Sequence, residues 1–179
     1  LVASVCQHRT GLIEFSAGVY DTDKSDHSWA SWFMYADDPY TSWSTPVEVT
    51  FTGAGAPSFP QGVFCDDIVE LPSGNLLVSG YALTGDGIWR AYCAISTDDG
   101  ETWEYQGRIA DSVSGYNTLE TSLTVLPDGT LLATLHTEDA NPAMMYRTTS
   151  TDEGATWAAL TSLGIRTRNR NSVLAHPDG

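Results

Sequence analysis

The sequence predicts an all-β protein, a β-propeller made of four-stranded antiparallel sheets. Two repeated motifs support this prediction. An eight-residue motif at 96–103 returns nearly unchanged at 150–157, and a turn motif flanked by apolar runs stands at 71–77 and again at 126–132. Turn residues interrupt every apolar run before three helical turns could form, so long helices are not expected. A repeat of about 50 residues with several short strands is typical of propeller blades rather than of helical repeats.

The eight-residue motif, Ser-x-Asp-x-Gly-x-Thr-Trp, has the chemistry of a turn between two strands. In the first copy, the carboxylate of Asp98 can accept hydrogen bonds from backbone N–H groups, and Gly100 can adopt a positive φ. The hydroxyl of Thr102 can close the loop, and Trp103 supplies an apolar plate that can pack against a neighbouring unit. The second copy offers the same groups 54 residues later. The motif therefore predicts fold rather than function.

The second motif, in which Pro-Ser/Asp-Gly separates two apolar runs, predicts a hairpin. Its turn glycines are Gly74 and Gly129, and a shortened copy ends at Gly179, so the intervals are 55 and 50 residues. A worn copy of this motif at 8–13 and a degenerate copy of the eight-residue motif at 36–43 mark a first unit. Each unit is expected to hold four strands.

The motifs divide the chain, a single partial propeller, into three blades and the innermost strand of a fourth. We place these units at about 1–52, 62–110, 116–164 and 171–179. Three blades and one strand do not close a ring, because the sheet faces at both ends would stay open. We expect a six-bladed ring, completed either by blades beyond Gly179 or by a second copy of the chain.

Composition and charge argue against several classes of function. The chain has 179 residues and a net charge of −15, from 23 acidic and 8 basic residues, which argues against nucleic acid and anionic membranes as partners. No apolar run is long enough for a transmembrane helix. The three cysteines lack paired spacing, so we expect reduced thiols at Cys6, Cys65 and Cys93. The histidines lack the spacing of metal ligands, and neither a metal site nor a cofactor is predicted.

Strand order places the two motifs on one face of the ring and a set of polar loops on the other. These loops join strands two and three of each blade, or one blade to the next, and lie close to the channel. Nine residues before the turn glycines, Cys65, Glu120 and Arg170 begin the innermost strands, with Asp66 and Asp67 following Cys65. These first residues should converge on one pocket that holds carboxylates and a guanidinium group.

Such a pocket suits glycoside chemistry, in which one carboxyl group protonates the leaving oxygen and another group acts as base, nucleophile or nucleophile activator. Two plainer explanations stay open. Acidic residues at loop ends often cap turns. The alternating arginines at 166, 168 and 170 could also form a solvated edge that pairs with the acidic surface.

The eight-residue motif resembles the Asp-box of bacterial-neuraminidase repeats, which occurs in sialidases and related β-propellers. Residues 120–132 are similar to the sialidase segment whose first glutamate polarises the tyrosine nucleophile, and the resemblance implies this role for Glu120. Residues 20–26 resemble the loop that bears the sialidase acid/base aspartate, which implies that role for Asp26, with Asp23 close to it. The resemblance also favours a secreted or periplasmic protein.

The sequence departs from the sialidase pattern where the substrate carboxylate would be held. Sialidases use three arginines for this purpose, and His136 occupies the position of the arginine that follows the Glu120 hairpin. Arg170 can supply one of the three. Tyr116 is too near Glu120 in sequence to be assigned as the nucleophile. We predict that six residues bind the substrate: Asp23, Asp66, Asp67, Tyr116, His136 and Arg170.

The leading hypothesis is a carbohydrate-active propeller, a sialidase-like glycoside hydrolase of altered specificity that acts on a glycan or other small carbohydrate. Glu120 and Asp26 are its predicted catalytic carboxyl groups. Two alternatives stay open. One is a non-catalytic Asp-box propeller that binds a glycan or a protein through the same face, and the other is a scaffold without a pocket function.

Overall fold

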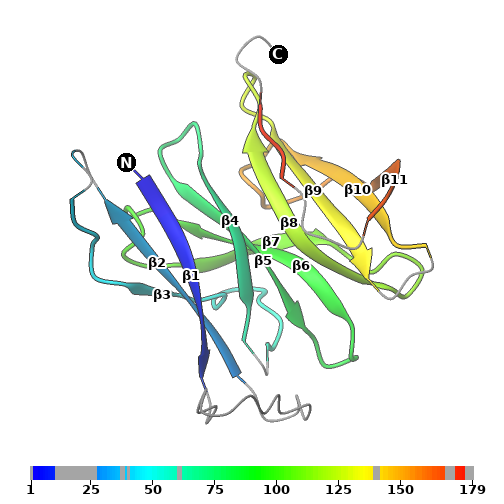
Figure 1. Ribbon diagram of the computed structural model, residues 1–179, viewed down its shortest axis with the longest axis horizontal. Helices are drawn as coiled ribbons and strands as arrows, with labels where there is room; N and C mark the ends of the chain where they lie inside the picture. The colour runs from blue at the N-terminus through cyan, green and yellow to red at the C-terminus, as the bar shows by residue number, and fades with distance from the viewer. Residues whose placement is uncertain are drawn as a thin grey trace.

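The computed structural model describes residues 2–10, 28–36, 39, 41–59, 62–138, 142–167 and 172–175. Within these ranges the regular secondary structure consists of β-strands in three antiparallel sheets (Figure 1). The first sheet contains β1 (Val2–Thr10), β2 (Ser28–Ala36) and β3 (Val47–Val49). The second contains β4 (Phe64–Glu70), β5 (Leu76–Leu83), β6 (Trp89–Ser96) and β7 (Glu104–Ala110). The third contains β8 (Asn117–Val125), β9 (Leu131–Glu138), β10 (Met144–Ser150) and β11 (Thr161–Arg166).

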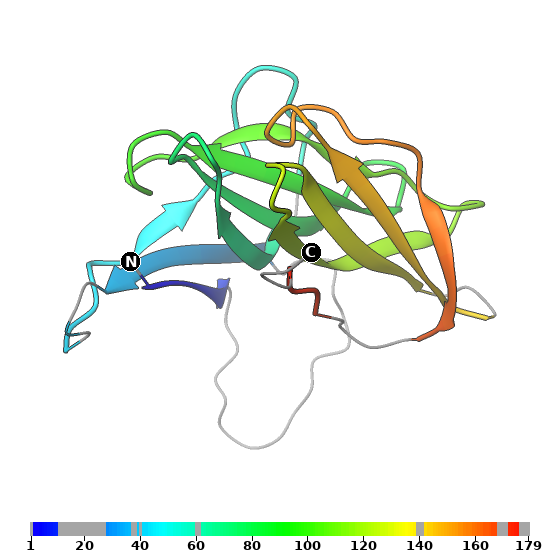
Figure 2. The same ribbon diagram turned by 90° about the horizontal axis from the view of Figure 1, so that it is seen from above.

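Each sheet is a meander in which consecutive strands are neighbours. The second and third sheets have the four strands that the repeats predict, so the all-β fold with four-stranded antiparallel sheets is confirmed for these two units. Viewed from above, the sheets are fanned side by side, with β3, β7 and β11 toward the outside (Figure 2). On the inner side, β4 contacts both β1 and β8. This is the arrangement of consecutive propeller blades.

The first sheet differs from its prediction. It contains three strands in the described part of the chain, where four were expected. Residues 8–10, expected at the start of a hairpin turn, continue β1 and pair with residues 28–30 of β2. The worn motif at 8–13 lacks the proline that favours a turn in the two later copies. Its local preference for a turn is therefore weak.

The two clear hairpin motifs form the predicted turns. Gly74 N–H donates to the carbonyl of Leu71 at 2.9 Å, and Gly129 N–H donates to that of Leu126 at the same distance. Both glycines have positive φ, of 89° and 86°. The turns join β4 to β5 and β8 to β9, the first and second strands of their blades.

The eight-residue motifs join the third strand to the fourth and close as predicted. Asp98 Oδ1 accepts hydrogen bonds from Ser96 Oγ at 2.8 Å and from the N–H of Thr102 at 2.9 Å, while its other oxygen accepts from the Thr102 hydroxyl. These hydrogen bonds, those of Thr102 above all, lower the pKa of Asp98. Gly100 has a φ of 89° and donates to Ser96 Oγ at 2.8 Å. The second copy repeats these bonds at Ser150, Asp152, Gly154 and Thr156.

Two apolar clusters fill the spaces between adjacent sheets. Successive side chains of β5 point to opposite faces, so Val78 joins the cluster toward the first sheet and Leu77 the cluster toward the third. Trp103 lies 3% exposed in the first cluster, with its ring centroid 5.4 Å from that of Phe33 in the preceding sheet. The predicted packing of the motif tryptophan against a neighbouring unit is therefore confirmed for this copy.

Cys65 and Cys93 are buried, and both carry reduced thiols. Burial raises the pKa of each thiol to about 12, so both are protonated and act as apolar core groups. The side chain of Cys6 lies outside the described part. Among the described residues, no helix has the length and apolar character needed to cross a membrane.

Candidate functional site

Strand β8 contains a β-bulge at the predicted functional residue. Leu119 pairs with His136 and Ser122 pairs with Thr134, so Glu120 and Thr121 together lie opposite a single residue of β9. Glu120 has a φ of 52°, in the left-handed region that non-glycine residues adopt rarely. Bulges redirect side chains and are frequent next to active sites, where backbone strain also accumulates.

The bulge directs the carboxyl group of Glu120 toward His136. Glu120 Oε2 lies 3.8 Å from His136 Nδ1, too far for a direct hydrogen bond. His136 is 1% exposed, whereas the side chain of Glu120 is 30% exposed, so the carboxyl group spans the border between core and solvent. Burial lowers the pKa of His136, and the charges of Glu120 and Glu138 oppose that shift only in part. The imidazole is therefore neutral at pH 7.

Unpaired polar atoms gather at this bulge. Glu120 Oε2, His136 Nδ1, Thr118 Oγ1 and Thr121 Oγ1 are buried and have no hydrogen-bond partner in the structure. In the described part of the chain, six buried side-chain atoms lack a partner, and these four are the majority. Buried polar groups are normally paired, so a concentration of unpaired ones needs an explanation, and a functional role for this bulge is one.

Asp66 and Asp67 lie in the corresponding bulge of β4, between the pairs Cys65↔Gly80 and Ile68↔Val78. Their side chains reach across to β8. Asp66 Oδ2 accepts a hydrogen bond from the N–H of Thr121 at 3.0 Å. Asp67 Oδ2 accepts from Ser122 Oγ at 2.7 Å and from the N–H of Leu123 at 3.1 Å, as one acceptor for two donors. The structure thus brings both aspartates to the residues that follow Glu120, and their binding of substrate stays a prediction.

Of the four remaining predicted site residues, the structure describes Tyr116. Tyr116 is 41% exposed and closes a turn with Val113, its N–H donating to the Val113 carbonyl at 3.0 Å. It stands directly before β8, four residues ahead of Glu120 in the sequence. Asp23, Asp26 and Arg170 lie outside the described residues.

Two features of this face escaped the sequence analysis. The first is a group of half-buried rings on β4, β5 and β6: Phe64 stacks on Tyr81 with ring centroids 5.1 Å apart, and Trp89 lies 5.8 Å and 5.9 Å from these rings. The backbone N–H of Trp89 donates to Asn117 Oδ1 at 3.0 Å, and this hydrogen bond joins the group of rings to the start of β8. The alternation of β5 could have indicated Tyr81 as a facing residue, but the partners come from separate strands.

The second missed feature is the buried arginine Arg90. Its guanidinium group pairs with Asp86 at 2.7 Å and with Asp111 at 2.6 Å, and it also donates to Thr84 Oγ1 at 2.7 Å. Asp111 also pairs with Arg108 at 3.3 Å. Arg90 therefore joins the loop after β5 to the segment after β7. The pKa of Asp86 is lowered, mainly by its hydrogen bonds to Arg90, so the group stays ionised.

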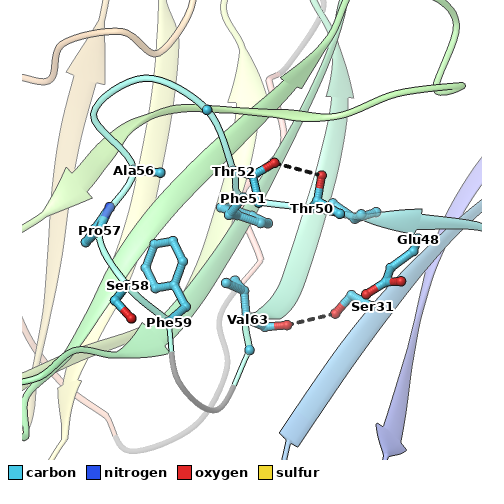
Figure 3. Close-up of a pocket in the computed structure, with 13 residues that line it drawn as sticks. Ser31, Glu48, Thr50, Phe51, Thr52, Ala56, Pro57, Ser58, Phe59 and Val63 are labelled. Atoms are coloured by element: carbon cyan, nitrogen blue, oxygen red, sulfur yellow. Dashed lines mark hydrogen bonds between the residues drawn. The ribbon is translucent and has the colours of Figure 1, made fainter.

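A cavity of about 470 Å³ lies between the first sheet and the segment that leads to β4 (Figure 3). Phe51, Phe59 and Val63 form its apolar wall. Ser31 Oγ, which faces it, donates to the carbonyl of Val63 at 3.0 Å and is thus already satisfied. None of the predicted site residues that the structure describes lines this cavity. Unpaired groups point to the β8 bulge as the better candidate site.

No group of three or more potential metal ligands occurs among the residues that the structure describes. The described residues of the candidate site offer carboxylates, hydroxyls, a neutral imidazole and aromatic rings. Such groups can bind a polyhydroxylated ligand through hydrogen bonds and ring contacts, and a carboxylate among them can take part in proton transfer.

Comparison with known proteins places the chain among repeat proteins. The model of the BNR repeat-like domain matches residues 18–179. The chain is similar to a solved structure of a protein of unknown function from Dyadobacter fermentans, with a TM-score of 0.69 and 20% identity over 83% of this chain and 42% of that one. No curated protein matches the sequence.

Two further solved structures carry enzyme names. The NanB sialidase from Streptococcus pneumoniae, as its K499G mutant, has a TM-score of 0.60 and 18% identity, over 82% of this chain and 21% of that one. The α-L-arabinofuranosidase Arb93A from Fusarium graminearum has a TM-score of 0.57 and 16% identity, over 76% and 44%. The chain spans less than half the length of each of these three structures, and at these identities the likeness concerns the fold. Because the family match covers nearly the whole sequence, the chain belongs to the BNR repeat-like domain family.

Proposed function

We propose that the chain is part of a carbohydrate-active propeller, a sialidase-like glycoside hydrolase of altered specificity, and that Glu120 is one of its working carboxyl groups. The supporting observation is the β8 bulge, where Glu120 has a left-handed backbone and an unpaired carboxyl oxygen beside a buried imidazole. The fold likeness to a sialidase and to an arabinofuranosidase agrees with this class of enzyme.

Hydrolysis of a glycoside needs a proton donor for the leaving oxygen and a second group that supplies or activates the nucleophile. Glu120 has the position for the second role, because one of its oxygens is buried while the rest of the side chain meets solvent. Asp26, for which the resemblance to sialidases implies proton donation, stands between β1 and β2 in the sequence and would supply that proton. The two carboxyl groups would then approach the glycosidic bond from different blades.

The charges near the site favour a neutral sugar. His136 is uncharged at pH 7 because burial lowers its pKa. In the described part of this face, Arg90 and Arg108 are occupied by ion pairs with Asp86 and Asp111. A substrate carboxylate would meet Glu120 without a free arginine from these loops, whereas sugar hydroxyls can pair with carboxylate, imidazole and threonine oxygen alike.

The proposal is tested by replacing Glu120 with glutamine in the full chain and assaying aryl glycosides of neutral sugars and of sialic acid. Glu120→Gln should lower kcat/KM on the cognate glycoside by about 10³-fold or more, with the circular dichroism spectrum unchanged. Glu101→Gln is the matched control, because Glu101 is an exposed glutamate in the turn on the opposite face. Unchanged activity of Glu120→Gln would refute the proposal, and glycan binding without turnover by the wild type would favour the non-catalytic alternative.

A further inference from the structure

Side-chain hydroxyl groups of one sheet accept hydrogen bonds from backbone N–H groups of the next sheet or segment. Ser31 Oγ accepts a hydrogen bond from the N–H of Cys65 at 3.1 Å, which links β2 to β4. From β8 of the third sheet, Ser122 Oγ accepts from the N–H of Val173 at 3.0 Å, and Thr124 Oγ1 accepts from that of Ala175 at 3.1 Å. At both of these contacts, a neutral hydroxyl accepts the hydrogen bond of a backbone N–H group.

The interface between the second and third sheets uses carboxylates in addition. Asp66 and Asp67, from the bulge of β4, accept three hydrogen bonds from residues 121–123 of β8, at distances of 3.0 Å, 2.7 Å and 3.1 Å. Hydrogen bonds to an ionised acceptor are stronger than neutral ones. Within the part of the chain that the structure describes, these carboxylate bonds to the backbone of a neighbouring sheet lie directly beside Glu120.

These bonds fix the peptide group that follows Glu120. The N–H of Thr121 belongs to the peptide plane whose carbonyl is that of Glu120, and Asp66 holds this N–H. Ser79 Oγ donates to the Thr121 carbonyl at 3.1 Å, so both backbone groups of Thr121 are held by the second sheet. The orientation of that peptide plane sets ψ of Glu120. Together, this ψ and the φ of 52° determine the direction of the Cα–Cβ bond from which the Glu120 side chain extends.

We propose that Asp66 and Asp67 are positioning residues for Glu120: they hold the left-handed bulge of β8 from the neighbouring blade and so aim the Glu120 carboxyl group at the site. This inference rests on the proposed function of Glu120. Without the two carboxylates, the strain of a left-handed glutamate would favour relaxation of the bulge, and the carboxyl group would shift while the sheets stayed paired. A displacement of about 1 Å in a reacting group can cost about 10²-fold in rate.

The test compares Asp66→Ala and Asp66→Asn with Ser31→Ala in the full chain. Ser31→Ala is the matched control, because it removes a side-chain oxygen that accepts a hydrogen bond from a backbone N–H group at the preceding interface. Asp66→Ala should lower kcat by about 10-fold to 100-fold with KM changed less than about threefold, and Asp66→Asn, which keeps an acceptor oxygen, should recover most of that loss. Ser31→Ala should leave kcat unchanged.

Amide hydrogen exchange gives a readout that does not depend on activity. Asp66→Ala should speed exchange at the N–H of Thr121 by about tenfold or more relative to Ser31→Ala, because its acceptor is gone. Equal exchange at Thr121 in the two variants, or equal kcat in Asp66→Ala and wild type, would overturn the positioning inference. If Glu120→Gln kept full activity, the proposed function itself would fail, whereas loss in Glu120→Gln with none in Asp66→Ala would refute the positioning role alone.

Discussion

His136 combines near-complete burial with a carboxylate neighbour, and these two influences act on its pKa in opposite directions. Desolvation disfavours the charged imidazolium and is the larger effect, so the pKa lies below the ordinary value. Glu120 and Glu138 raise it in part. The ring is therefore a neutral hydrogen-bonding group beside Glu120, whose character changes only when the solution becomes acidic.

This lowered pKa has a consequence for stability. Between the folded pKa of His136 and the unfolded value of about 6.5, the unfolded chain binds more protons than the folded chain. The contribution is fully present above about pH 6.5 and is lost as pH falls through that value toward the folded pKa. His136→Gln cannot titrate, so its free energy of unfolding should decline less than that of the wild type between about pH 7 and pH 5.

Urea unfolding of both proteins at each pH measures this difference. The informative quantity is the slope against pH, because glutamine also changes packing by an amount that does not depend on pH. All carboxylates are shared by the two proteins, which cancels their contribution to the slope. Parallel curves from pH 7 to pH 5 would contradict a lowered pKa at His136.

For individual residues, the sequence indicated which side chains belong to the candidate site but not which hydrogen bonds they form. Glu120 could be selected because it stands nine residues before the turn glycine Gly129. The same spacing before Gly74 gives Cys65, so Asp66 and Asp67, which follow it, were expected near Glu120. The φ of 52° at Glu120 could not be predicted, since glutamate has no preference for that conformation. The bonds from Asp66 to Thr121 and from Asp67 to Leu123 depend on the spacing between blades, which no local pattern contains.

Among the elements, the turn at 96–103 connects two strands and also touches the preceding sheet. A Cβ atom added to Gly100 would lie 2.1 Å from Cε1 of Phe33, a ring that is 1% exposed and cannot move aside easily. Gly74, in the hairpin turn, has the same φ of 89° with no heavy atom within 4 Å of its added Cβ. A comparison of the two glycines therefore distinguishes the strain of a positive φ, which both share, from the clash with the neighbouring sheet, which occurs only at Gly100.

Gly100→Ala should therefore destabilise the protein more than Gly74→Ala. Alanine at a left-handed position costs roughly 1 to 2 kcal/mol, which is the expected loss for Gly74→Ala. Gly100→Ala adds overpacking against Phe33, for a total of roughly 2 to 5 kcal/mol. Chemical denaturation of the two variants measures both values. Equal losses would show that Gly100 is required by its backbone conformation alone.

The elements that the sequence predicted well are those with strong turn chemistry. The Asp-type turns and the Pro-x-Gly hairpins each combine several residues with compatible preferences, and they define the four strands of the second and third sheets. The first sheet was predicted less well because its copies of both motifs are degenerate. There, pairing between β1 and β2 determines the structure, and such long-range pairing leaves little trace in local sequence.

For the whole molecule, three consecutive sheets follow one another in space, each packed against the next. All six residues of β11 are exposed, Leu163 and Ile165 among them at 36% and 50%. Strand β8 of the third sheet also presents the hydroxyls of Ser122 and Thr124 to the backbone of the segment 172–175. We propose that further blades complete a six-bladed ring, supplied either by a longer polypeptide or by a second copy of the chain. Either source would add side chains to the face that carries Glu120.

Charge is the other property of the whole molecule, and it leads to a prediction about salt. The net charge is −15, yet the three Arg–Asp ion pairs in the described residues share only two arginines, Arg90 and Arg108. With 23 acidic and only 8 basic residues, folding brings like charges closer together, and their repulsion should be screened at ionic strengths above about 0.1 M. We expect Tm at pH 7.5 to rise by a few degrees between about 0.01 M and 0.3 M NaCl.

Two comparisons identify screening as the cause of this rise. At about pH 4, where many carboxylates are protonated, the same salt range should raise Tm less, because less repulsion remains. MgCl₂ at matched ionic strength should act like NaCl, because repulsion spread over the surface responds to ionic strength rather than to a specific ion. A larger effect of Mg²⁺ would indicate a specific cation site. A fall in Tm with NaCl would mean that the Arg90 ion pairs contribute more to stability than the surrounding carboxylates remove.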